Sequence, residues 1–223
     1  MHYKERFLHL LVRTGALKFG SFVLKSGRTA PYFFNAGSIH RGADLAELAA
    51  CYAEGLLDSG FEVDVLFGPA YKGIPLAVST SVLLAQEHGK SLGYCFNRKE
   101  AKDHGADAGT VLVGASLTPE TRVVLLDDVI TAGTAVRESL EVLKREGNPQ
   151  ITGIVVALHR MEKNNDGVDA LKVIQEDLGI PVFPLVNLDE LLAALHNKPV
   201  DGKIVLGDAE FKAISDYRAQ YGI

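Results

Sequence analysis

Apolar and polar positions along this chain fall into blocks that predict strands and helices in alternation. Short apolar runs have the length of strands, and the run 123–126 is continuous, as in a strand buried on both faces. The predicted strands are 63–67, 91–97, 110–115, 123–126, 152–158 and 181–186. Helical spacing predicts helices at 3–12, 45–57, 74–88, 136–143, 168–178, 188–196 and 208–221, and residues 17–35 read as a hairpin or small subdomain. This alternation predicts an α/β fold in which helices cover both faces of a parallel sheet.

The most informative segment is 122–135. Its apolar strand turns abruptly polar at Asp127 and Asp128, a turn of small residues follows, and helical spacing begins after it. In an open parallel sheet, ligands bind beyond the carboxyl ends of the strands, which is where this turn is expected. Small residues let the backbone approach a ligand closely, and the free N–H groups at a helix start attract anions. The loop therefore suits a phosphate, with Thr131 and Thr134 as hydroxyl donors.

The two carboxylates of this segment have a different expected partner. They would repel a phosphate, and they are better suited to accept hydrogen bonds from sugar hydroxyls or to hold a divalent cation through water. A phosphate site beside a diol site indicates a ribose 5-phosphate. An acid–base pair of the glycosidase kind is disfavoured, because adjacent strand residues point to opposite faces. The alternative is an ordinary strand–turn–helix corner with solvated Asp residues.

Composition and charge narrow the function classes. The chain has 223 residues, enough for one domain with a sizeable core, and its net charge of -5 argues against a nucleic-acid binder. Any anion site must then be local. The two cysteines, Cys51 and Cys95, form no Cys-x-x-Cys motif, so no zinc or redox site is predicted. The N-terminus lacks an apolar signal core and no apolar run has membrane-spanning length, so we expect a soluble, cytoplasmic protein.

Two further segments could bind anions. Residues 68–73 have the glycine spacing of a nucleotide P-loop, but Ile74 and Pro75 stand where Lys and Ser/Thr would be required, so a Walker-type ATPase is disfavoured. This short loop still suits a pyrophosphate, with Lys72 either contacting it or simply solvated. The basic segment 98–104 is either a solvated loop or a lid that closes over a charged substrate.

Candidate contacts for a base come from two other places. The adjacent aromatics Phe33 and Phe34 have either a core role or a role in covering a flat ring. Arg160 follows a predicted strand, where its planar fork can bind a carboxylate.

These segments carry a resemblance to a known family. Segment 124–134 resembles the phosphoribosyl pyrophosphate (PRPP) signature of the type I phosphoribosyltransferases. Segments 25–35, 67–75 and 94–105 are similar to parts of the bacterial orotate phosphoribosyltransferases, and the resemblance spans nearly the whole chain.

The resemblance implies a type I phosphoribosyltransferase fold in one domain, 1–223. A central parallel sheet flanked by helices is expected over about 41–190, with a small hood subdomain from about 1–40 plus part of the C-terminal region. It implies transfer of the 5-phosphoribosyl group from PRPP to orotate, with Mg²⁺, forming orotidine 5′-monophosphate and pyrophosphate in pyrimidine biosynthesis. It also implies a homodimer in which the lid, 98–109, reaches the neighbouring subunit's site.

The same resemblance assigns roles to individual residues. Those expected to bind PRPP are Lys25, Tyr71, Lys72, Arg98, Lys99, Lys102, His104, Asp127, Asp128, Val129, Ile130, Thr131, Ala132, Gly133, Thr134 and Ala135. Those expected to bind orotate are Lys25, Phe33, Phe34, Thr131 and Arg160, although His159 is a less familiar neighbour for that arginine. The expected catalytic residues are Lys72, Lys102, His104, Asp127 and Asp128. Mg²⁺ is expected to be held mainly by substrate and water near the two aspartates, with no direct ligand assigned.

Two alternative functions stay open from the sequence. One is a phosphoribosyltransferase for uracil, a purine or a related base, against which Arg160 and the segment 25–34 argue. The other is a non-catalytic relative that binds an effector and regulates transcription. The acidic charge and the lack of a spare DNA-binding domain argue against this second alternative.

Overall fold

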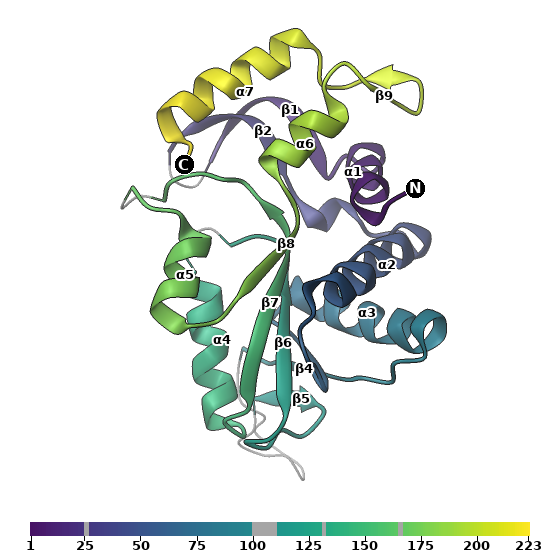
Figure 1. Cartoon of the computed structure of the whole chain (residues 1–223), viewed down its shortest axis with the longest axis vertical. Helices are drawn as coiled ribbons and strands as arrows, with labels where there is room; N and C mark the ends of the chain where they lie inside the picture. The colour runs from purple at the N-terminus through teal and green to yellow at the C-terminus, as the bar shows by residue number, and fades with distance from the viewer. Residues whose placement is uncertain (25–26, 100–110, 131–132, 165–166) are drawn as a thin grey trace.

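A computed structural model describes all residues except 25–26, 100–110, 131–132 and 165–166. In the part of the chain that it describes, the centre of the fold is a six-stranded sheet (Figure 1). Its strands, in spatial order, are β5 (Leu112–Gly114), β4 (Gly93–Asn97), β3 (Val65–Gly68), β6 (Arg122–Asp127), β7 (Gln150–His159) and β8 (Val182–Asn187). All neighbouring pairs are parallel except β4 and β5, which are antiparallel. The predicted parallel sheet is therefore confirmed, with one antiparallel strand added at its edge.

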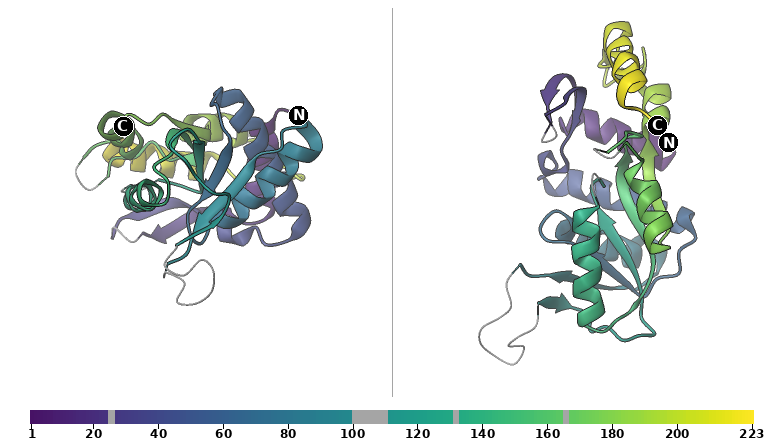
Figure 2. Two further views of the ribbon diagram at one scale, coloured as in Figure 1. Left: turned by 90° about the horizontal axis from the view of Figure 1, so that it is seen from below. Right: turned by 90° about the vertical axis from the view of Figure 1, so that its left-hand side faces the viewer.

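Helices cover both faces of this sheet. One face packs against α2 (Gly42–Ser59) and α3 (Gly73–His88), and the other against α4 (Thr134–Arg145) and α5 (Ala170–Leu178), which lie in front of the sheet in the right-hand view of Figure 2. Strand β6 shows why its apolar run is continuous: Val124 and Leu126 enter one core cluster, while Val123 and Leu125 enter the other. All four are at most 1% exposed, and each such side chain contributes about 1.5–3 kcal/mol of hydrophobic stabilisation.

The remaining elements gather beyond one end of the sheet, where both chain termini also lie (Figure 1). They are α1 (Tyr3–Arg13), the hairpin of β1 (Leu17–Val23) and β2 (Thr29–Phe34), the 3-10 helix Ala36–Ser38, α6 (Leu188–Leu195), the short hairpin of β9 (Pro199–Val200) and β10 (Lys203–Ile204), and α7 (Asp208–Tyr221). We call these elements the hood. Their apolar residues, including Phe7 and Ile214, join the same core cluster as the α2 and α3 face.

Local sequence signals explain where the helices start and stop. Gly60 and Gly89 end α2 and α3 in the left-handed conformation, with φ of 70° and 65°, which glycine adopts without strain. Pro75 lies in the first turn of α3, where its missing N–H has no intrahelical partner to lose. Among the described residues, no helix is long and apolar enough to cross a membrane.

Candidate active site

The predicted site segments meet at one edge of the sheet. Strands β3, β6 and β7 are adjacent and parallel, so their carboxyl ends lie together. The loop 69–72 follows β3, Asp127 ends β6 with Asp128 directly after it, and Arg160 follows β7. Ligands of open α/β sheets bind at this edge, so the topology brings three separate stretches of sequence to one place.

The loop 69–72 is held in a tight turn by two glycines. A Cβ on Gly68 would lie 2.1 Å from the carbonyl oxygen of Gly73, and a Cβ on Gly73 would lie 2.5 Å from Pro69 Cδ. The two backbones are therefore in direct contact, which no other residue type allows. The Gly73 N–H donates to the Pro69 carbonyl at 2.9 Å, and the Ala70 N–H donates to Asn97 Oδ1 at 3.0 Å. Asn97 at the end of β4 thus positions this loop, a role that no pattern in the sequence predicts.

Lys72 bridges this loop to the acidic pair. Its Nζ lies 2.6 Å from Asp128 Oδ2, and the Val129 N–H donates to the other carboxylate oxygen at 2.9 Å. Asp128 is only 6% exposed, so this pair is partly shielded from water and less screened than a surface ion pair. This pair holds the half-exposed lysine at the carboxyl edge of the sheet.

Asp127 has a different environment from its neighbour. Its Oδ1 accepts the Asp128 N–H at 2.8 Å, and its carbonyl accepts the hydroxyl of Tyr52, a fully buried residue of α2, at 2.8 Å. Burial raises the pKa of the Asp127 carboxyl above its ordinary value, and the charge on Asp128 raises it further. The two aspartates therefore differ electrostatically: Asp128 has a cationic partner, whereas Asp127 has a costly charge that a ligand hydroxyl or a cation could stabilise.

The loop after the acidic pair leads directly into α4. Gly133 has φ of 74°, and a Cβ there would meet Ile174 of α5 at 2.9 Å, so both its conformation and the space around it require glycine. Helix α4 starts at Thr134, so the free N–H groups of its first turn lie beside the acidic pair. Ile130 is buried and Val129 packs on the core, so their side chains are structural. The expected residues Thr131 and Ala132 lie outside the described part of the chain.

Arg160 lies in a polar cluster between the sheet and the hood. Its Nε and Nη2 donate to Glu162 Oε1 at 3.1 and 2.8 Å, and its guanidinium carbon lies 4.9 Å from the centre of the Tyr32 ring. The Tyr32 hydroxyl donates to the same Glu162 oxygen at 2.7 Å. Burial raises the pKa of Tyr32, which keeps this hydroxyl protonated as a donor. The position of Arg160 after a predicted strand places it at this edge, whereas no pattern in the sequence indicates Tyr32 or Glu162.

Of the other predicted residues, some lie in the described part of the chain and some do not. Phe33 is exposed and stacks on Phe22 with ring centres 5.6 Å apart, whereas Phe34 packs on the core, so the pair divides between two sides of β2. The ammonium of Lys99 lies 4.8 Å from the centre of the Tyr71 ring, at the exposed side of the loop 69–72. The predictions for Lys25, Lys102 and His104 fall outside the described residues.

His159, the unfamiliar neighbour of Arg160, has a structural contact. Its Nε2 lies 3.2 Å from Asp169 Oδ1, and the same Asp169 oxygen accepts the Leu171 N–H at 3.0 Å as the N-cap of α5. His159 therefore ties the end of β7 to the start of α5.

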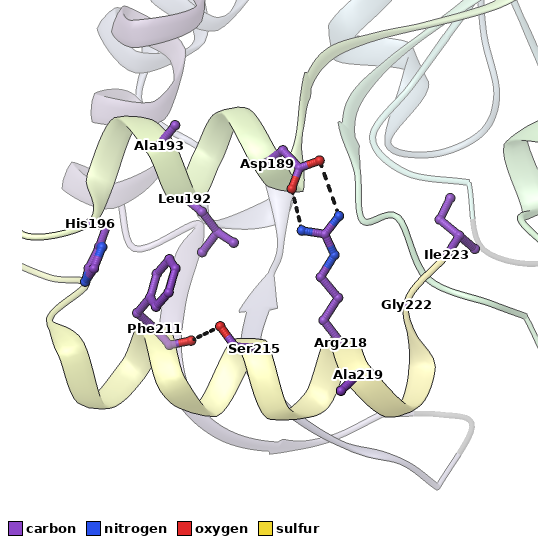
Figure 3. Close-up of a pocket in the computed structure, with 10 residues that line it drawn as sticks. All are labelled: Asp189, Leu192, Ala193, His196, Phe211, Ser215, Arg218, Ala219, Gly222 and Ile223. Atoms are coloured by element: carbon purple, nitrogen blue, oxygen red, sulfur yellow. Dashed lines mark hydrogen bonds and ion pairs between the residues drawn. The ribbon is translucent and has the colours of Figure 1, made fainter.

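A cavity of about 670 Å³ lies elsewhere, between α6 and α7 of the hood (Figure 3). Arg218 spans it to Asp189, and His196 stacks on Phe211 with ring centres 4.0 Å apart. Its lining contains none of the predicted site residues. The carboxyl edge of the sheet, and not this cavity, therefore remains the candidate active site.

Comparison with known proteins identifies the family. The model of the phosphoribosyl transferase domain matches residues 35–185. An orotate phosphoribosyltransferase from Pseudomonas paraeruginosa is 48% identical over 225 residues, covering 99% of each protein. The chain belongs to the orotate phosphoribosyltransferase family. A crystal structure of orotate phosphoribosyltransferase from Francisella tularensis superposes with a TM-score of 0.83 at 40% identity, covering 97% of this chain and 99% of that one.

Membership of the orotate phosphoribosyltransferase family settles several expectations. The type I phosphoribosyltransferase fold is confirmed, and the chain is an enzyme, a transferase of pyrimidine biosynthesis. Neither alternative function is favoured by these relatives. A more distant structure, the orotate phosphoribosyltransferase of Mycobacterium tuberculosis in complex with PRPP, has a TM-score of 0.61 at 18% identity and supports the fold alone.

Proposed function

We propose that the carboxyl edge of β3, β6 and β7 is where this chain transfers the 5-phosphoribosyl group from PRPP to orotate. The observation that carries the proposal is the meeting of three features at that edge: the glycine-closed loop with Lys72, the acidic pair, and Arg160. Each suits a different part of the two substrates. The products are orotidine 5′-monophosphate and pyrophosphate.

The first part of the proposal concerns PRPP. The loop 69–72 offers backbone N–H groups and Lys72 to the pyrophosphate, and the turn before α4 offers its N–H groups to the 5′-phosphate. Asp127 and Asp128 accept hydrogen bonds from the ribose hydroxyls. Lys72 is paired with Asp128 in this structure, so an arriving pyrophosphate would compete with that carboxylate for the ammonium. Arg98 and Lys99, together with Lys102 and His104 beyond the described residues, would complete the anion site.

The second part concerns orotate. Arg160 has the planar fork that a carboxylate needs, and orotate carries a carboxylate that uracil lacks. Of the two aromatics on β2 of the hood, the exposed Phe33 would cover the flat ring, while Phe34 packs on the core behind it, and Lys25 and Thr131 would be further contacts. The position of Arg160 between the sheet and the hood supports this assignment, because a base held there would lie between the two parts.

The chemistry proposed is substitution at the anomeric carbon of the ribose, with inversion and oxocarbenium character. Orotate nitrogen is already anionic after ionisation, so catalysis rests on positioning and on stabilising charge. Bound Mg²⁺ would neutralise charge on the leaving pyrophosphate. The ion would be held mainly by substrate and water near Asp127 and Asp128. Lys72 and the basic lid stabilise the departing pyrophosphate.

The assembly and location belong to the same proposal. We expect a homodimer in which the segment 98–109 contributes to the neighbouring subunit's site, and we expect it in the cytoplasm. A lid from a partner would exclude water from the reacting centre when both substrates are bound.

Replacing Arg160 by Gln tests the base assignment. Arg160→Gln should raise the KM for orotate about tenfold to a hundredfold, because a charge-assisted bidentate contact is lost, while the KM for PRPP stays near its wild-type value. Steady-state rates over both substrates measure this. An unchanged KM for orotate in a folded variant would remove Arg160 from the orotate site.

A further inference from the structure

Hydrogen bonds join the segment that carries Arg160 to the hood. The Lys163 N–H donates to the Tyr221 carbonyl at 2.8 Å, and the Ile223 N–H donates to the Met161 carbonyl at 3.1 Å, so the C-terminal residues pair with the chain beside Arg160. From the β1–β2 hairpin, Arg28 Nη1 donates to the Lys163 carbonyl at 2.7 Å. Three parts of the chain distant in sequence therefore converge immediately after β7.

Glu162 is the centre of this convergence. Its Oε1 accepts from the Tyr32 hydroxyl at 2.7 Å and from Arg160 Nε and Nη2 at 3.1 and 2.8 Å. Its Oε2 accepts from the hydroxyl of Tyr217, in α7, at 3.2 Å. The Glu162 side chain is 13% exposed and that of Arg160 is 18% exposed, so the pair is largely buried. Both oxygens of the carboxylate accept hydrogen bonds. It connects β2, the end of β7 and α7 through one side chain.

The contact with Glu162 uses only one edge of the guanidinium. A guanidinium has five N–H donors and can bind one carboxylate through Nε and Nη2 and a second through Nη1 and Nη2. Glu162 and the Tyr32 ring fix the plane of Arg160, and within the described part of the chain Nη1 makes no hydrogen bond, so that side can meet a second anion. An arginine side chain loses much rotamer freedom when it binds a ligand, and a side chain already held in place loses less.

We propose that Glu162 is a positioning residue for orotate recognition: it fixes the Nε edge of Arg160 so that the Nη1–Nη2 edge meets the orotate carboxylate. This rests on the proposed role of Arg160. Tyr32 and Tyr217 hold Glu162 in turn, so the hood and the sheet must be correctly docked for the arginine to be aligned. Base selectivity is thereby coupled to the packing of α7, which has no predicted substrate contact of its own.

Glu162→Gln is the variant that tests this inference, because glutamine keeps the shape of the side chain and removes its charge. The KM for orotate should rise about tenfold or more, since a charge-assisted pair is lost, whereas kcat and the KM for PRPP should stay within about twofold. Tyr217→Phe, which removes one support of Glu162 without touching Arg160, should raise the KM for orotate by a smaller factor in the same direction.

Asp189→Asn is the matched control. It removes the carboxylate partner of Arg218 between α6 and α7, a more exposed ion pair of the hood that does not involve Arg160. It should lower thermal stability without changing the KM for orotate. The inference is overturned if Glu162→Gln is folded and its KM for orotate stays within twofold of the wild type, or if both KM values rise together. Should Glu162→Gln fail to fold, an unchanged KM for orotate in Tyr217→Phe overturns it.

The Arg160→Gln variant separates this outcome from failure of the proposed function. A large rise in the KM for orotate in Arg160→Gln, with none in Glu162→Gln, leaves Arg160 in the orotate site and removes only the role of Glu162. An unchanged KM for orotate in both variants removes both roles.

Discussion

Replacing Gly73 by Ala should lower the free energy of unfolding and also displace the loop 69–72. The added Cβ would lie 2.5 Å from Pro69 Cδ and 2.8 Å from both the Gly68 carbonyl carbon and the Leu126 carbonyl oxygen. Two of these atoms are backbone and cannot rotate away, so the loop 69–72 has to move off β6. Overpacking of this kind costs about 1–3 kcal/mol. Because Lys72 is in the displaced loop, a shift of about 1 Å would also lower turnover or raise the KM for PRPP by about tenfold or more.

Gly42→Ala is the matched control for this variant. Gly42 is likewise the first residue of a helix, α2, and a Cβ added there meets nothing within 4 Å. Its alanine variant should be as stable as the wild type or slightly more so, because alanine has less backbone entropy to lose. Urea unfolding midpoints and PRPP saturation curves compare the three proteins. Equal midpoints and equal PRPP kinetics in Gly73→Ala and Gly42→Ala would refute the reasoning from the close backbone contact.

Other perturbations test the acidic pair, the ion pair between Asp64 and Arg122, and the lid. Tyr52→Phe leaves the Asp127 carbonyl without its buried donor and should cost about 1–3 kcal/mol in urea unfolding, so an unchanged midpoint would contradict that contact. Because the pKa of Asp127 is raised in the folded protein, the unfolded chain releases this proton at a lower pH. The free energy of unfolding therefore falls by about 1.4 kcal/mol per pH unit as the pH rises from the ordinary pKa of 3.8 to the raised pKa. Relative to the wild type, Asp127→Asn should therefore become more stable as the pH rises across that range, and the difference should stay constant above it. A difference in unfolding free energy that does not depend on pH would show that the pKa is not raised. Asp64 should behave in the opposite way, because its hydrogen bonds with Arg122 lower its pKa to about 2. Asp64→Asn should be less stable than the wild type at neutral pH, and this loss of stability should disappear as the pH falls through that value. Lys102→Ala should lower kcat far more than it weakens orotate binding, and a near-normal kcat would remove its catalytic role.

Local patterns in the sequence were enough to predict most of the elements. The run from Val123 to Leu126 was predicted as a strand buried on both faces, and its residues alternate between the two core clusters. The pattern does not predict that β5 runs antiparallel, because the alternation of side chains along a strand is the same in both directions. The hairpin of β9 and β10 was missed for a different reason: a strand of two residues is too short to show a pattern.

The site shows a similar division between local and distant information. The acidic pair, the loop with Lys72 and Arg160 are site candidates from the sequence because each follows a predicted strand, and the family resemblance adds the roles of Lys72 and Arg160. Their partners were not found, because those contacts join positions far apart in the sequence. Asn97 and Ala70 are 27 positions apart, and Tyr32 and Glu162 are 130 apart. Only the topology of the sheet and the docking of the hood bring such residues together.

The central claim is that this sheet edge transfers a phosphoribosyl group to orotate and selects orotate by its carboxylate. The most direct test follows the loss of orotate absorbance when PRPP and Mg²⁺ are added to the wild-type protein, with uracil as a parallel substrate. We expect a fast signal that depends on Mg²⁺ and appears with orotate only. Equal turnover of uracil, or no turnover of either base by a folded protein that still binds PRPP, would contradict it.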